Sequence, residues 1–356
     1  MACTGDIRTL VDYLNYSNAS TVDARFCNLF LECIQLTSAP ELPATTLAEH
    51  CYSGMFTYCI SLTEAPELPA ETLAEGCYSG MFSGCEGLTE APALPAETLA
   101  EGCYSDMFSG CSALTEAPAL PATTLAKECY SNMFEGYTSL NTVPTLPAVA
   151  LAESCYSSMF KGCTRLSTAP ALPAETLAAG SYSNMFHNCK VLAQAPVLLA
   201  KTLAESCYHS MFLDCEVLTQ APALPAMTLA QSCYTSMFHG CTGLTQAPAL
   251  PAMVLAEYCY KQMFIDCTNL TTTPELPAKT LSAGCYSGMF RLCKNLKNVT
   301  MLATDISAQS CLSYWLYEVA KEGTFTKAAE MTSLPSGDGD ASIPSGWIVQ
   351  DYTESE

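Results

Sequence analysis

Basic side chains and histidines are scarce in this sequence. Its 356 residues include 14 Lys and Arg against 35 Asp and Glu, and only four His. The resulting formal charge of −21 repels a phosphate backbone, so we expect no nucleic-acid partner. Charged residues make up only 14% of the chain and apolar residues 49%, a composition that argues against disorder.

Membrane and catalytic motifs are also missing. There is no apolar run of about 18 residues, so no membrane insertion is expected. The segment Met1–Asp6 lacks the basic and apolar regions of a signal peptide. No phosphate-binding loop, HExxH or Gly-x-Ser-x-Gly occurs, and none of the histidines, His50, His187, His209 and His239, accompanies an obvious nucleophile. The sequence therefore predicts a protein that is not an enzyme and that needs no cofactor.

The dominant feature that is present is an internal repeat. A Met-Phe pair recurs every 26 residues from Met55-Phe56 to Met289-Phe290, and Leu29-Phe30 and Trp315-Leu316 extend the register by one step at each end. Columns of Leu, Tyr and Cys keep the same step. A unit this short cannot bury its apolar face alone, and stacking it on its copies makes a continuous core. We therefore predict a repeat solenoid of about twelve 26-residue coils.

Each coil divides into two halves. Leu73, Cys77, Met81 and Cys85 are four residues apart, a spacing that predicts a short helical segment. The other half, typified by residues 62–69, reads as extended. Its Pro66 lacks an amide hydrogen, so any strand there should be short. The expected fold class is α+β.

Most of the 22 cysteines fall into two columns, interrupted at Ser181 and Tyr137. Within a coil the two columns are eight residues apart, too far along a helix for a disulfide. Their spacing includes no CxxC of the kind typical of zinc sites. We expect mainly buried free thiols; some disulfides stay open as an alternative, and no metal site is predicted.

The ends of the chain depart from the repeat. Residues 1–24 are predicted to form an N-terminal cap with a short helix, since Ile7, Leu10, Val11 and Leu14 follow helical spacing. Residues 25–318 form the solenoid and residues 319–356 a β-rich C-terminal cap. Within that cap, strands are expected after Gly323 and Gly346, with Trp347 over the final coil.

The unit that begins at Cys77 resembles the BspA-type leucine-rich repeat. The matching positions are Cys77 for the family's Ile, Met81-Phe82 for its Ala-Phe pair, Cys85, Leu88, and Leu94-Pro95 for its apolar-Pro pair. The resemblance covers about residues 25–318. It implies a leucine-rich-repeat-like solenoid and an adhesin-like protein of host-associated bacteria, or a phage protein carrying the same module.

Two variable columns are candidate binding residues, because solenoids bind through ladders of exposed side chains. One column changes from acidic to neutral along the chain and contains Glu64, Glu90, Glu116, Gln194, Gln220 and Gln246. The other follows the Phe of each unit and contains His187, Leu213, His239 and Ile265. From the sequence, a solvated face that is free to vary is the simpler explanation of both columns, and a binding surface is the alternative.

Two functional hypotheses follow. The first is a non-catalytic, surface-displayed binding module for a host or bacterial surface protein or a glycan, at the cell surface or outside the cell. The alternative is a structural spacer, such as a fibre or stalk component. Drift in the exposed columns favours binding, and the near-identity of the early units favours a spacer. The sequence leaves the ligand and the oligomeric state open.

Overall fold

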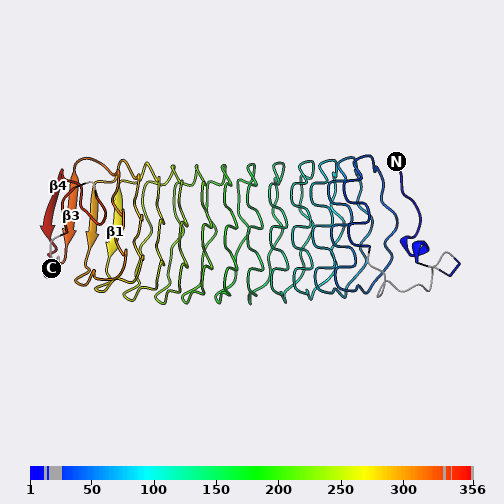
Figure 1. Cartoon of the computed structure of the whole chain (residues 1–356), viewed down its shortest axis with the longest axis horizontal. Helices are drawn as coiled ribbons and strands as arrows, with labels where there is room; N and C mark the ends of the chain where they lie inside the picture. The colour runs from blue at the N-terminus through cyan, green and yellow to red at the C-terminus, as the bar shows by residue number, and fades with distance from the viewer. Residues whose placement is uncertain (12–13, 16–25, 332–333, 338, 354–356) are drawn as a thin grey trace. The chain divides into compact units, whose positions relative to one another are not determined.

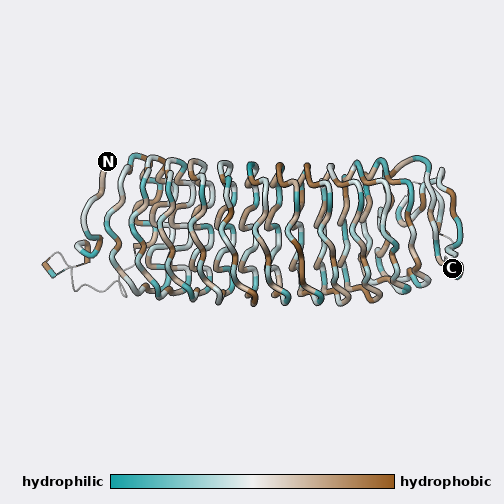
Figure 2. Tube along the Cα trace, turned by 180° about the vertical axis from the view of Figure 1, so that it is seen from behind, coloured by the Kyte–Doolittle hydropathy of each residue, from teal (hydrophilic) through white to brown (hydrophobic). Residues whose placement is uncertain are grey.

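A computed structural model describes residues 1–11, 14–15, 26–331, 334–337 and 339–353. The chain divides into two compact units, Met1–Pro173 and Ala174–Glu356. Each unit consists of turns stacked at the 26-residue step, and hydrophobic and hydrophilic stretches alternate along the tube (Figure 2). The chain is therefore a repeat solenoid, as predicted. The count of twelve coils stays a prediction.

The half of each coil that carries the Met-Phe pair is a run of hydrogen-bonded turns. In the first unit, Tyr52 N donates to Cys77 O (3.0 Å) and Phe56 N donates to Met81 O (2.9 Å), so alternate amides bond to the next coil. The amides between them close turns within the coil, as Met55 N does on Tyr52 O (3.2 Å). The second unit repeats this pattern, with Tyr234 N donating to Cys259 O (3.0 Å).

The predicted helical segment is wrong, because the four-residue spacing has another origin. Every fourth residue of this half has a positive φ, as at Gly76 (56°), Gly80 (62°) and Gly84 (70°). A left-handed residue at each fourth position interrupts any α-helix, and glycine adopts it without steric cost. In the described residues the only helix is the 3-10 helix η1, Ile7–Leu10. The α+β assignment therefore does not hold.

The extended half is short of regular strands, as Pro66 and its copies predicted. Over most of the described chain it forms isolated parallel bridges, such as Thr46↔Thr72 and Thr202↔Thr228. Among the described residues, continuous strands occur only toward the C-terminus, and the first of them still contains Pro274, the last proline of this column. Proline supplies no ladder hydrogen bond, and the pairing of that strand shifts register between Thr272 and Glu275. The later strands lack this proline and pair in regular register.

The C-terminal strands form one parallel sheet in the order β1-β2-β3-β4, seen side by side in Figure 1. They span Thr272–Leu276 (β1), Asn298–Met301 (β2), Gly323–Lys327 (β3) and Trp347–Asp351 (β4). Both strands predicted in the tail are confirmed. Trp347 is buried and its Nε1 donates to Ala320 O (2.7 Å), which anchors β4 on the preceding turn.

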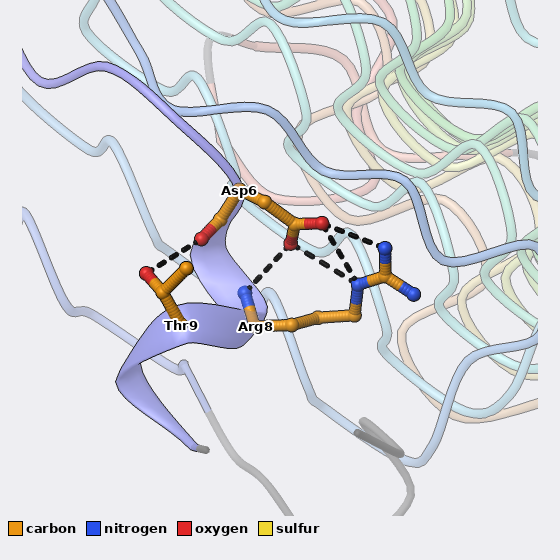
Figure 3. Close-up of polar contacts among 3 residues, drawn as sticks. All are labelled: Asp6, Arg8 and Thr9. Carbon is orange, nitrogen blue, oxygen red and sulfur yellow. Dashed lines mark hydrogen bonds and ion pairs between the residues drawn. The ribbon is translucent and has the colours of Figure 1, made fainter. Parts of the chain in front are cut away.

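The N-terminal segment adds a short parallel strand-like edge before η1. Cys3 N donates to Ser38 O and Ile7 N to Glu41 O, both at 3.1 Å. Asp6 caps η1: its Oδ1 accepts from Arg8 N (2.9 Å), and its carboxylate pairs with the Arg8 guanidinium (Figure 3). This hydrogen bonding lowers the pKa of Asp6.

The expected capping helix is only partly present. Ile7 is buried, but Leu10, Val11 and Leu14 are exposed, so their spacing does not mark a packed face. Residues 12–13 and 16–24 of the predicted cap lie outside the described residues. The boundaries at residues 24/25 and 318/319 stay predictions.

Candidate functional site

The interior of each unit is filled by identical side chains placed one above another. Consecutive Phe rings stack with centroids 5.5–6.1 Å apart, and consecutive Tyr rings with centroids 5.7–6.0 Å apart. The Met of each pair, such as Met107 and Met237, is fully buried beside them. Because this core is buried and closely packed, we look for a ligand site on the exposed columns.

The cysteines belong to this core, and all 22 are free thiols. All are buried except Cys3, Cys27 and Cys33. In the cysteine column that is interrupted at Tyr137, the thiol also donates a hydrogen bond to the Phe carbonyl of the preceding coil. Cys85 Sγ, for example, donates to Phe56 O (3.1 Å). A thiol there therefore fills space and links two coils, which spacing alone did not show.

Burial makes these thiols poor nucleophiles. Desolvation raises the pKa of Cys77 to about 12, and the same cause raises the pKa of Cys129 and of Cys207 to about 12. A thiol in this environment stays protonated at neutral pH, and the thiolate is the reactive form. The buried columns therefore offer no activated nucleophile.

Ser181 interrupts the first cysteine column and provides a stability test. Its side chain is fully buried, and among the described residues its hydroxyl has no hydrogen-bond partner. An unsatisfied buried hydroxyl costs about 1–3 kcal/mol. We expect Ser181→Cys to raise the free energy of unfolding by roughly that amount, measured by urea denaturation under reducing conditions. The matched change at exposed Ser345 should leave stability unchanged, and a Ser181→Cys protein no more stable than the parent would contradict this account.

The acidic-to-neutral column lies on the surface. Glu64, Glu90 and Glu116 are exposed, and so are Gln194, Gln220 and Gln246. Parallel bridges join Glu64 to Glu90 in the first unit and Gln246 to Thr272 in the second. Within each unit this column is therefore a ladder of neighbouring side chains available to a ligand.

The column after the Phe is less accessible than the sequence suggested. Ile265 is buried, which corrects its prediction as an exposed binding residue. His187, Leu213 and His239 are half-buried. Burial lowers the pKa of His239, although the nearby carboxylates of Asp214 and Asp266 favour the charged form. An apolar residue fits this column because the turns on either side cover it.

A surface feature that sequence reasoning missed is a groove on the extended half of the first unit, which we call the proline groove. It consists of two adjoining hollows of about 510 and 280 Å³ that share Pro66, Glu67 and Pro69. Buried Leu42 and Leu68 form its floor, and the other prolines along it are Pro40, Pro43, Pro92 and Pro95. The signal available in the sequence is a second proline in the extended half, as Pro69 follows Pro66, repeated in most coils.

Glutamates line the proline groove. Glu41 and Glu67 border the hollows and are exposed. Glu71 and Glu97 are also exposed, and they lie four residues beyond the outward-facing positions Glu67 and Ala93. Among the described residues, none of these four carboxylates has a basic group within ion-pair distance. The groove is thus apolar below and negative above.

Nothing in the described ranges resembles a metal or membrane site. No group of three or more His, Cys, Asp or Glu side chains there could hold a metal ion. In the same part of the chain, no helix has both the length and the apolar character needed to cross a membrane.

Comparison with known families identifies the repeat. A family model described as the BspA type leucine rich repeat region, in 6 copies, matches residues 49–193 and 212–328, which is more than half of the chain. No curated protein and no solved structure matches. The resemblance deduced from the sequence is therefore confirmed.

Proposed function

Because this chain belongs to the BspA type leucine-rich-repeat family, we propose that it is a non-catalytic binding module displayed at a cell surface. Its ligand is a host or bacterial surface protein or a glycan. The observation that carries the proposal is the exposed Glu/Gln ladder, which stands on a core of buried, repeated side chains. Solenoid proteins of this kind bind through such columns, since each coil adds one more contact.

A screen of the intact chain against host proteins and glycans tests this function. Replacing Glu64, Glu90 and Glu116 with Lys should weaken the binding of a ligand found in the screen. A control with the same charge change at the exposed residues Glu49, Glu86 and Glu205 should retain binding. A hit that is unaffected by the ladder variant would move the binding site elsewhere.

A structural spacer, such as a fibre or stalk component, is the second candidate. The observation that favours it is the regularity of the core, where Phe and Tyr rings repeat with little change in separation. Such a stack resists bending without needing any ligand. Absence of binding by the intact chain to every protein and glycan in the screen would favour the spacer.

A further inference from the structure

We infer that the proline groove of the first unit is a docking surface for an extended, cationic segment of a polypeptide partner. This inference rests on the proposed binding function and names its partner class. It places the contact on the extended half of the coils, beside the Glu/Gln ladder.

The shape of the groove suits the side chains of Lys and Arg. The two hollows are continuous along successive coils, and their floor and walls are Leu, Pro and Ala. Long basic side chains can lay their aliphatic stems on such a surface while the charged head stays at the rim. Glu41 and Glu67 stand at that rim, so one basic residue meets both an apolar floor and a carboxylate.

The negative charge of the first unit favours a cationic partner. Residues 1–173 contain five Lys and Arg against 19 Asp and Glu, and among the described residues neither Glu41 nor Glu67 forms an ion pair with a basic group of the chain. Stacked like charges repel one another, and a cationic partner removes that repulsion while adding its own attraction. An acidic or neutral partner would leave the repulsion in place.

The second unit provides an internal comparison. Its proline columns continue except at Leu199, and the outward positions that match Glu41 and Glu67 are Val197, Ala223, Ala249 and Glu275. The positions that match Glu71 and Glu97 are Glu175, Lys201, Met227, Met253 and Lys279. The second unit therefore keeps single carboxylates in these columns, but no two neighbouring coils there repeat the adjacent pair Glu41 and Glu67.

The lining also argues for a polypeptide over a sugar. Among the residues that the structure describes, no aromatic side chain lines either hollow. Sugar rings commonly stack on aromatic faces, whereas the apolar stems of an extended peptide need only aliphatic contact. Proline walls offer that contact without exposing amide hydrogens that the partner would have to satisfy.

The test uses the full chain and a fluorescent peptide of alternating Lys and Ala, with a Glu-Ala peptide of the same length as the sign control. We expect the Lys-Ala peptide to bind, with an affinity that falls as salt rises. The double variant Glu41→Gln/Glu67→Gln should weaken it about tenfold. The matched pair Glu49→Gln/Glu86→Gln removes the same net charge from exposed positions outside the groove and should change affinity less than twofold.

Equal weakening by the two variants would reduce the effect to net charge and overturn the docking surface. Binding of the Glu-Ala peptide, or absence of Lys-Ala binding at low salt, would also overturn it. All four substituted glutamates are exposed, so circular dichroism should show the parent spectrum for each variant. If a ligand from the wider screen bound the groove variants as tightly as the parent chain, the docking surface alone would be refuted. A screen that yields no ligand would refute the binding function.

Discussion

Raising the pH above about 9 is expected to unfold this protein steeply, under conditions that leave ordinary small domains folded. An unperturbed thiol ionises near pH 8.5. Burial raises the pKa of Cys77, Cys129 and Cys207 to about 12, and it raises the pKa of many other column cysteines as well. Over this window the unfolded chain loses protons that the folded chain keeps.

The sign follows from proton linkage. A group whose pKa is raised by folding gives its full stabilisation below the unfolded pKa and loses it as the pH rises through the folded pKa. For each such thiol, the free energy of unfolding falls by about 1.4 kcal/mol for every pH unit between its unfolded and its folded pKa. Ten thiols acting together would remove on the order of 10 kcal/mol or more in one pH unit, comparable to the whole stability of a typical domain.

Urea unfolding followed by circular dichroism from pH 7 to 11, with a reductant present, measures this effect. Alkylation with iodoacetamide provides an independent count, because the buried thiols should react only as the fold is lost. Replacing Cys3, Cys27 and Cys33 with Ser removes the thiols that are not buried and should leave the midpoint unchanged. A free energy of unfolding that stays flat up to pH 11 would show that the buried thiols do not titrate as described.

Removing one ring from the core is expected to cost about 3–5 kcal/mol. Phe238 is fully buried between Phe212 and Phe264, with centroid distances of 5.7 and 5.6 Å. Phe238→Ala would leave a cavity that neighbouring coils cannot fill, because each is held by its own hydrogen bonds to the next. The loss should appear as a lower urea midpoint and as faster amide exchange in the adjacent coils of the second unit.

Val254→Ala is the matched control, since Val254 is 78% exposed. A surface truncation of this kind should change stability by less than about 0.5 kcal/mol. If Phe238→Ala cost no more than the control, the stacked rings would not be the main source of cohesion in the unit.

The sequence predicted the repeat length and the buried columns well, because both depend on apolar side chains that must be covered. Cys85, Met107 and Leu244, all assigned to the core from periodicity, are fully buried. The turns were misread because a helical face and a chain of left-handed turns both repeat about every four residues. Gly76 and Gly80 were the distinguishing signal: glycine weakens a helix but suits a positive φ.

The candidate surface was harder to predict. The exposure of Glu64 was expected from its variable, polar column, whereas the burial of Ile265 could not be read from its column, which also holds charged and polar residues. The proline groove depends on the depth between neighbouring coils, which no single coil encodes. The residue types of each exposed column can thus be read from the sequence, whereas the depth and shape of the surface between coils cannot.

The hydrogen bonds between coils constrain how such a chain can change in length. Within each compact unit, successive coils are joined by amides that donate to the next coil, as Gly54 N does toward Ser79 O (2.8 Å) and Gly80 N toward Ser105 O (2.7 Å). Loss or gain of a few amino acids would misalign donors and acceptors on both sides at once. Duplication of one complete 26-residue coil would leave every partner matched. Such a solenoid can therefore grow or shorten in multiples of 26 residues.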